Sequence, residues 1–205
     1  MEQEFSSALL ENAVSSLSRL PGVGRKTALR FALHLLRRPS DEAVAIGEAI
    51  INLRTGIRYC SVCHNISESE VCSLCASPKR DRSIVCVVEN VKDVMSIENT
   101  RRFEGLYHVL GGLISPVDGI GPDLLEIQSL AERVKADEVS EVILATGATV
   151  EADTTNYYIY RMLSRINPDL KITQLARGVS VGDEIEYTDE VTLARSLTAR
   201  TPFEL

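Results

Sequence analysis

Hydrophobic side chains recur every three or four residues through the first 55 positions of the chain, which is the spacing of amphipathic helices. The pattern predicts a first helix from about Phe5 to Leu20 and, after a Pro-Gly break, a second helix that begins behind Gly24. A third helix is expected to begin after Ser40-Asp41, a pair typical of helix N-caps, and to run into the cysteine-containing segment. The N-terminal part of the chain is therefore predicted to be a small all-helical module.

A different pattern begins after Asp81, where short apolar runs alternate with amphipathic segments. Such runs predict buried strands, and strands separated by helices predict a parallel α/β sheet. The expected strands cover residues 83–89, 106–110, 142–146 and 171–176, and the expected helices cover 91–99, 124–135, 154–166 and 191–197. A Gly- and Pro-rich loop is expected at 111–122.

Between these two regions, residues 60–78 contain few aliphatic side chains and cannot form a core of their own, so a ligand has to supply the order there. The predicted fold class is accordingly an α/β multi-module chain. Its expected divisions are a helical unit at 1–55, a cysteine module at 56–80, a parallel α/β domain at 81–177 and a C-terminal segment at 178–205.

The net charge of the chain narrows the classes of function that the protein can have. The 205 residues include 22 Lys and Arg against 29 Asp and Glu, a net charge of −7, which excludes a uniformly basic nucleic-acid coat or a polybasic membrane binder. The first residues carry acids where a signal peptide needs bases, and no run approaches the ~18 apolar residues of a membrane span. We therefore expect a soluble, cytoplasmic protein with no membrane partner.

The basic residues are concentrated in one place. Between Ala13 and Pro39 the chain has six basic residues and no acid, namely Arg19, Arg25, Lys26, Arg30, Arg37 and Arg38. Within this stretch, Gly22 and Gly24 join the two predicted helices and would leave backbone N–H groups open to a phosphate oxygen. The turn resembles the helix-hairpin-helix motif, which grips the nucleic-acid backbone without reading its sequence. The alternative is a Pro-Gly turn with a solvated basic face, and a dinucleotide fingerprint is excluded because no strand precedes the glycines.

Four of the five cysteines form two Cys-x-x-Cys knuckles separated by eight residues: Cys60 and Cys63, then Cys72 and Cys75. Four thiolates at this spacing can close a tetrahedron around Zn²⁺ with no open position, which is a structural rather than a catalytic site. The alternative is free or redox-active thiols. Cys86 is expected to be a core residue, His64 a surface residue, and His34 and His108 structural residues.

Acidic residues follow the predicted strands of the α/β domain. Glu89 and Asp93 come after the first strand, and Glu151 and Asp153 after the strand at 142–146, at the edge where parallel sheets place their sites. Carboxylates converging there could hold Mg²⁺. The pattern resembles the Toprim domain of topoisomerases and primases, but Glu151 replaces an Asp and Thr155 replaces a further acid. An acidic docking surface for a partner, or a weak metal site, is therefore favoured over metal-assisted phosphoryl chemistry.

Together these motifs resemble the bacterial recombination-repair family RecR. The resemblance rests on LPGVGRKTALR, CSVCHNISESEVCSLC, IVCVVEN, LYHVLGGLISPVDGIGP and GVSVGDEIEYTDEVTLARSL, in that order along nearly the whole chain. It implies a helix-hairpin-helix unit, a four-cysteine zinc finger, a Toprim domain and a C-terminal segment that contacts another subunit. One departure is Val179-Ser180-Val181-Gly182-Asp183, where many relatives have Pro and a second Gly.

The resemblance also implies a function. It implies a non-enzymatic DNA clamp that forms homodimers and homotetramers and acts with RecO and RecF at gaps, helping RecA to load. Lys26 and Arg30 would contact single- or double-stranded DNA independently of sequence, the four cysteines would bind zinc, and the four acids would contact a partner. The alternative is a Mg²⁺-dependent Toprim nuclease or topoisomerase, with Glu89 as acid or base and Glu151 with Asp153 as metal ligands.

Overall fold

A computed structural model describes residues 7–136, 138–179, 182 and 184–202. The chain divides into two compact units, Met1–Ile57 and Arg58–Leu205, and each unit is described separately below. Phe5, which the sequence places in the first helix, lies outside the described residues, as do Ser180, Val181 and Asp183 of the departing segment.

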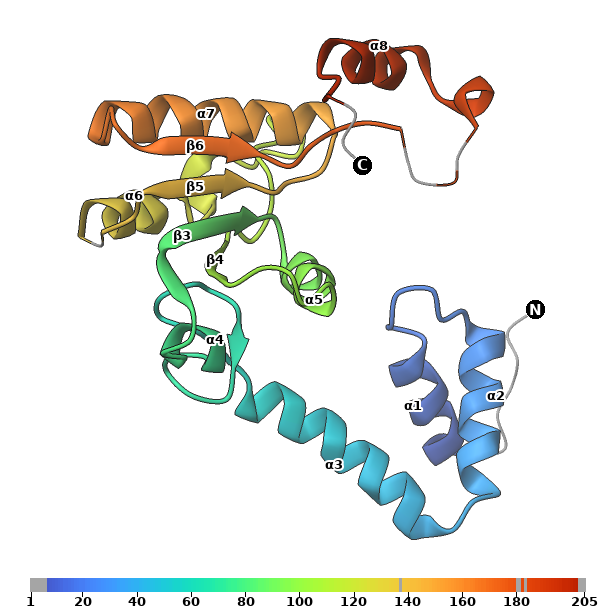
Figure 1. The fold of residues 1–205 in the computed structure, drawn as a ribbon. Helices are drawn as coiled ribbons and strands as arrows, with labels where there is room; N and C mark the ends of the chain where they lie inside the picture. Colours follow the sequence, from blue (N-terminus) through green and yellow to red (C-terminus); the bar gives the residue numbers. More distant parts are fainter. Residues whose placement is uncertain (1–6, 137, 180–181, 183, 203–205) are drawn as a thin grey trace. The chain divides into compact units, whose positions relative to one another are not determined.

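The N-terminal unit contains the helices α1 (Ala8–Leu17), α2 (Arg25–Leu36) and α3 (Ser40–Gly56) (Figure 1). These helices confirm the periodicity of the sequence, although α3 ends at Gly56 instead of continuing into the cysteine segment. The core of this unit is small. Its buried residues are Val14, Ala28 and Ala32, against which Leu10, Leu17, Val23 and Leu29 pack.

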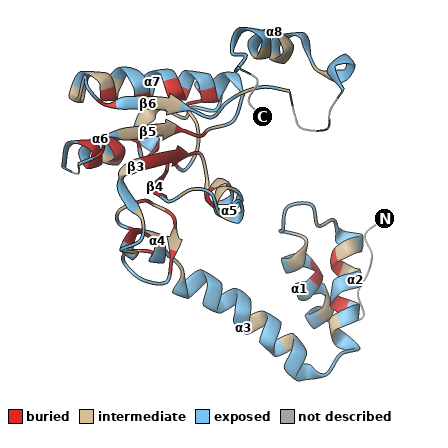
Figure 2. Cartoon of the chain, viewed as in Figure 1, coloured by how far each residue is buried: buried red, intermediate tan, exposed pale blue. Residues whose placement is uncertain are grey.

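The third helix of this unit has an uncovered apolar surface. None of the residues of α3, all of which are described, is buried (Figure 2). The exposed fractions of its large apolar side chains are 56% for Val44, 49% for Ile46, 61% for Ile50, 61% for Ile51 and 63% for Leu53. The spacing of these side chains puts them on more than one side of the helix, so α3 leaves apolar surface uncovered within this unit.

The second unit is built on a parallel sheet with the strand order β4-β3-β5-β6 (Figure 1). The strands are β3 (Asp81–Val88), β4 (Gly105–Val109), β5 (Glu141–Leu144) and β6 (Lys171–Gln174). The chain leaves β3 for β4 on one side and then crosses to β5 on the other side. This reversal marks the carboxyl ends of β3 and β5 as the place where open parallel sheets bind ligands.

Both faces of β3 are covered, which explains its continuous apolar run. Val85 and Val87 face the larger core, which contains side chains of α6 (Ile127–Ala136) and α7 (Val150–Ile166). Cys86 and Val88 face a smaller core with α5 (Val91–Asn99). Because successive side chains of a strand point to opposite faces, a run of four buried residues identifies a central strand.

Two helix boundaries differ from the sequence prediction. Helix α7 begins at Val150, four residues before the expected Thr154, because the Thr149 side chain accepts a hydrogen bond from the Ala152 N–H at 3.2 Å and caps the helix. Helix α6 begins at Ile127, after the 3-10 turn η1 (Pro122–Leu124) that Gly121 and Pro122 initiate. The earlier start of α7 changes the surroundings of two of the predicted site acids.

The Gly- and Pro-rich loop at 111–122 is anchored to the sheet domain through Thr155. This threonine is fully buried, and its Oγ1 accepts the Ile114 N–H at 2.9 Å while donating to the carbonyl of Glu151 at 2.7 Å. Gly111 and Gly112 have φ values of 82° and 158°, which let the chain turn at the end of β4. The position where a Toprim enzyme often carries a further acid therefore has a structural role here.

The C-terminal segment contains the 3-10 turn η2 (Ile185–Tyr187) and the helix α8 (Glu190–Thr198), which confirms the helix expected at 191–197. It leaves four large apolar side chains more than half exposed: Ile185, Tyr187, Val191 and Leu197. Within the described residues, no helix is both long enough and apolar enough to cross a bilayer.

Candidate nucleic-acid and metal sites

The turn between α1 and α2 has the open backbone that the two glycines predict. Gly22 has φ +78°, a conformation that side chains disfavour, and the Val23 N–H donates to the Leu20 carbonyl at 3.0 Å to close the turn. A Cβ added at Gly22 or Gly24 would meet no atom within 4 Å. Steric crowding inside the unit therefore does not explain Gly24, and the backbone there is accessible to a ligand.

Helix α2 begins directly behind this turn. Its N-cap is Gly24, which has no side chain to accept a hydrogen bond from the N–H groups of the first turn. These groups and the helix dipole give the N-terminus a partial positive charge that favours anions. No acid lies in the first turn to neutralise it.

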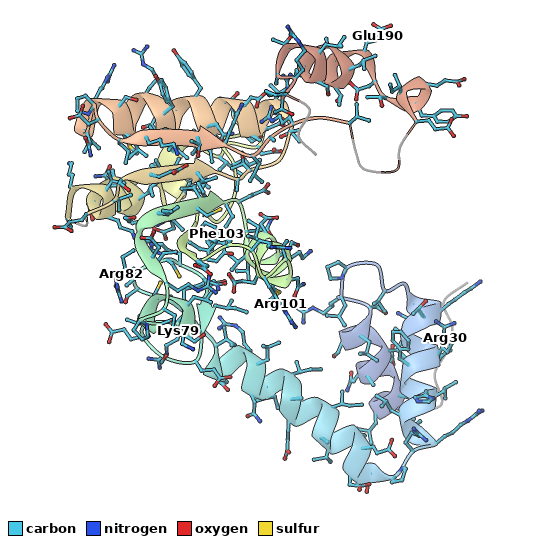
Figure 3. The ribbon with its side chains drawn as sticks, viewed as in Figure 1. Arg30, Lys79, Arg82, Arg101, Phe103 and Glu190 are labelled. Atoms are coloured by element: carbon cyan, nitrogen blue, oxygen red, sulfur yellow. The ribbon has the colours of Figure 1, made fainter. Side chains whose placement is uncertain are left out.

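The basic residues predicted at this site lie on the first turns of α2. Arg25, Lys26 and Arg30 are all exposed, and Figure 3 shows Arg30 projecting from the helix. Lys26 and Arg30 are four residues apart and therefore share one face of α2. The structure thus brings the two glycines and the three basic residues together at one end of the helical unit, while their contact with DNA stays a prediction.

The cysteine tetrad forms as the sequence predicts. Its members are Cys60, Cys63, Cys72 and Cys75; they are buried, and their sulfur atoms all lie within 4.8 Å of one another. The scaffold is a short antiparallel pair, β1 (Arg58–Tyr59) with β2 (Ile66–Ser67), followed by the helical turn α4 (Ser73–Ala76). Among the described residues, this tetrad is the group of three or more His, Cys, Asp or Glu side chains that is close enough to hold one metal ion.

Hydrogen bonds favour the thiolate at Cys60, whereas the pKa values of Cys63 and Cys72 are raised. The N–H groups of Val62 and Cys72 donate to the Cys60 sulfur at 3.5 and 3.3 Å, and these bonds outweigh burial and lower the pKa of Cys60 to about 7. The pKa of Cys63 is raised, first by its hydrogen bond with Cys75 and then by burial. Four sulfurs this close cannot all ionise without a cation, and an all-sulfur tetrahedron is the preferred structural site of Zn²⁺.

The cysteine module is attached firmly to the sheet. The Val109 N–H of β4 donates to the Cys63 carbonyl at 2.9 Å, and an Arg82 Nη donates to the Cys75 carbonyl at 3.1 Å. The ring of His64 packs edge-on against the ring of His108, with 5.1 Å between centroids. The expectation that His64 lies on the surface is therefore wrong, because its side chain is only 21% exposed.

The other two histidines differ from each other. His108 is fully buried, as expected, and its Nε2 lies 2.7 Å from the Glu126 carbonyl, while burial lowers its pKa to about 3 and keeps the ring neutral. His34 is exposed on α2, so the expectation of a packed, structural residue is wrong there. Cys86 is buried in β3 outside the tetrad, and burial raises its pKa to about 12.

The predicted acids all lie at the carboxyl end of the sheet, but local interactions occupy some of them. Glu89 directly follows β3 and is half-buried. The carboxylate of Asp93 accepts the Asn90 N–H at 2.9 Å and completes a capping box at the start of α5. Glu151 and Asp153 lie in the first turn of α7, where acids stabilise the helix dipole, instead of in a loop after β5.

Asp153 has two arginine partners that the sequence did not indicate. Its carboxylate lies 2.6 Å from an Nη of Arg177 and 3.6 Å from an Nη of Arg195 in α8. The hydrogen bond from Arg177 lowers the pKa of Asp153. These three residues line a cavity of about 700 Å³ between the end of β6 and α8. Asp153 thus connects the sheet domain to the C-terminal segment.

Family models match successive parts of the chain. The model described as "RecR, helix-hairpin-helix" matches residues 10–54, and the model of the RecR zinc finger domain with four cysteines matches 57–77. The model described as "Toprim domain" matches 83–176, and "RecR, C-terminal" matches 178–201. The cysteine tetrad lies within its match, and the matches for the helical unit and the parallel sheet cover most of α1 to α3 and of β3 to β6.

Similar proteins match the full length of the chain. A protein of Parabacteroides distasonis is 60% identical over 205 residues, covering 100% of this chain and 98% of its own length. A protein of Bacteroides fragilis is 56% identical over 203 residues, covering 99% and 98%, and one of Flavobacterium johnsoniae is 51% identical over 201 residues, covering 98% and 97%. All three are named "Recombination protein RecR".

We expect Cys72→Ser to abolish stoichiometric zinc binding, because a hydroxyl is a poor replacement for one of four thiolates and the buried tetrad offers no substitute. Elemental analysis of the purified full-length protein measures the ratio of zinc to chain. Cys86→Ser is the matched control, since it replaces a buried cysteine outside the tetrad and should leave one zinc per chain. Retention of one zinc by Cys72→Ser would contradict the assignment.

Proposed function

Since the chain belongs to the RecR family of recombination proteins, we propose that it is a non-enzymatic recombination mediator that encircles DNA as an oligomeric clamp. In this proposal it acts with RecO and RecF at single-strand gaps and helps RecA to load. The observation that carries the proposal is the open hairpin turn followed by the uncapped, basic start of α2, which is suited to phosphate groups. Its site of action would be chromosomal DNA in the cytoplasm, at the nucleoid.

The hairpin supports binding without sequence preference. Gly22, Gly24, Arg25, Lys26 and Arg30 offer backbone N–H groups and cationic side chains, which are donors for phosphate oxygens and not a set arranged to read base edges. Both single- and double-stranded DNA present such phosphates. In this proposal the helical module at residues 1–55 contacts DNA, and the modules at 56–80, 81–177 and 178–205 provide structure, partner contacts and subunit contacts.

Two apolar surfaces support assembly of several chains. One is on α3 in the N-terminal unit, and the other is on η2 and α8 in the second unit, where Tyr187 is 79% exposed. A second copy of the chain is the occupant we propose for both, because two separate surfaces that each pair with the same surface of another copy would let dimers close into a tetramer. A closed assembly would add the phosphate contacts of several hairpins and make release from DNA slow.

The state of the acids supports a binding role over catalysis. Asp93 caps α5, and Asp153 is paired with two arginines. Thr155 accepts a hydrogen bond from the Ile114 N–H and so fixes the loop at that residue. Glu89 and Glu151 carry the remaining acidic charge at the sheet edge, and we propose that this edge contacts RecO or RecF. Among the described residues, no three carboxylates lie close enough together to hold one metal ion.

Replacing Lys26 by Ala should weaken DNA binding similarly on unrelated sequences. Losing one phosphate contact lowers the magnitude of the slope of log K against log salt by about 0.9 on duplex DNA. Fluorescence anisotropy with labelled duplexes at several salt concentrations measures this slope. Lys135→Ala, which removes an exposed lysine at the end of α6, is the control and should leave the slope unchanged. An unaltered slope for Lys26→Ala would refute the hairpin contact.

Charged substitutions in the two apolar surfaces should divide the assembly. Ile50→Asp in α3 and Tyr187→Asp in η2 are each expected to convert tetramers to dimers, and the double variant should be monomeric, because each change buries a charge in one interface. Sedimentation velocity measures the masses. Val117→Asp, at a loop residue that is 97% exposed, should behave as the unmodified chain. A monomeric unmodified chain at tens of micromolar would contradict the proposed clamp.

Incubation with supercoiled plasmid and Mg²⁺ distinguishes a clamp from an enzyme. We expect DNA that is retarded in a gel and returns to its original topology after protease treatment. The Glu89→Gln variant should give the same result, because a clamp needs no acid or base at the sheet edge. Nicked or relaxed plasmid after protease treatment, lost in Glu89→Gln, would establish the catalytic alternative.

A further inference from the structure

One face of α2 carries a line of cationic and hydrogen-bonding side chains that extends beyond the hairpin. Lys26, Arg30, His34 and Arg37 line a single groove of about 390 Å³, together with Leu29 and Leu33. All six residues belong to α2 or its C-cap, so the groove lies entirely within the N-terminal unit. We call this groove the α2 stripe.

The spacing of the α2 stripe follows one side of the helix. Lys26, Arg30, His34 and Arg37 are separated by four, four and three residues, which keeps them on one face at 3.6 residues per turn. At a rise of about 1.5 Å per residue, the line from residue 26 to residue 37 is roughly 16 Å long. Since one strand of duplex DNA rises ~3.4 Å per nucleotide along the duplex axis, a line of this length can face several successive phosphates.

The surroundings of the stripe are suited to a sugar-phosphate backbone. The residues that line the groove, all of them described, include no acid. Leu29 and Leu33 also line the groove; Leu33 is 40% exposed, and Leu29 packs in part against the core of the unit. Cationic groups that can bind phosphates and apolar side chains that can contact sugars therefore lie side by side in this groove.

Arg38, which follows Arg37 in the chain, shows that the α2 stripe does not include every basic residue near the end of α2. Arg38 is adjacent to Arg37, yet its Nε lies 3.0 Å from a carboxylate oxygen of Glu42 at the start of α3. It lines a different, mainly apolar groove, with Leu36 and Ala43. One arginine of the pair thus joins the stripe, and the other makes an internal ion pair.

We infer that α2 binds one nucleic-acid strand along its length, with His34 and Arg37 contacting phosphates beyond those bound at the hairpin. The ligand of this unit is then a run of consecutive phosphates in one strand and not a single phosphate at the helix N-terminus. Both ring nitrogens of a cationic histidine, or one of a neutral histidine, can donate to a phosphate oxygen. The inference rests on the proposed DNA-binding function and adds His34 and Arg37 to its contacts.

The test uses the full-length chain and a fluorescein-labelled single strand of 30 thymidines, titrated by anisotropy at 50 and 200 mM salt. Arg37→Ala should lower the magnitude of the slope of log K against log salt by about 0.7. When salt is raised from 50 to 200 mM, the affinity of the unmodified chain should therefore fall by a factor about threefold larger than the affinity of the variant. His34→Gln should weaken binding at 50 mM salt, and His34→Arg should strengthen it. Arg38→Ala, which removes the same charge one residue away, is the matched control and should change neither quantity.

The outcomes separate this inference from the proposed function. If Lys26→Ala weakens binding while Arg37→Ala, His34→Gln and His34→Arg all behave like Arg38→Ala, the extended stripe is overturned and the hairpin contact stands. If Lys26→Ala also has no effect, the proposed function fails as well. His34→Arg adds a charge at an exposed helix position. The inference predicts that this variant binds more tightly, a result that a variant with impaired folding would not give. Far-UV circular dichroism confirms that each variant retains its helices.

Discussion

Four cysteine sulfurs within 4.8 Å of one another impose the constraint on which the second unit depends. A set of thiols this crowded cannot ionise together without a cation, and the segment that carries them has no aliphatic core to hold it otherwise. The tetrad ends at Cys75, only six residues before the central strand β3 begins at Asp81. Because the Cys63 carbonyl also accepts the Val109 N–H of β4, order at the metal site extends directly into the sheet.

In the N-terminal unit, the feature that matters most is the separation of basic residues from acidic ones. The chain is acidic overall, with a net charge of −7, so it would be repelled by a polyanion if its charges were evenly mixed. The acid-free stretch from Ala13 to Pro39 concentrates positive charge on the hairpin and on one face of α2. Several acids of the second unit lie in the first turns of its helices, among them Asp93, Glu151 and Asp153. In the proposed function, one surface of the chain would bind phosphates and another would bind a protein partner.

Local signals in the sequence predicted most of the fold, and long-range contacts account for what it missed. Periodicity identified the helices of both units and the strands of the sheet, and the knuckle spacing identified the metal site. The start of α7 was missed because the cap is Thr149, a residue whose role depends on where β5 ends. The partners of Asp153 come from beyond β6 and from α8, far along the chain. His34 was misplaced because it lies among apolar neighbours, although its own position in the helical period is on the basic face.

Each helical unit has few basic residues, and the proposed assembly of several chains would compensate for this small number. Affinity for a phosphate backbone grows with the number of contacts and falls steeply with salt, so one hairpin and stripe would hold DNA only weakly at cellular ionic strength. A closed assembly multiplies these contacts without requiring any single one to be strong, and each unit can release and rebind while the others remain attached. In the proposed clamp, the exposed apolar side chains of α3 and α8 would join the chains, and the basic face of α2 in each chain would add its phosphate contacts to those of the others.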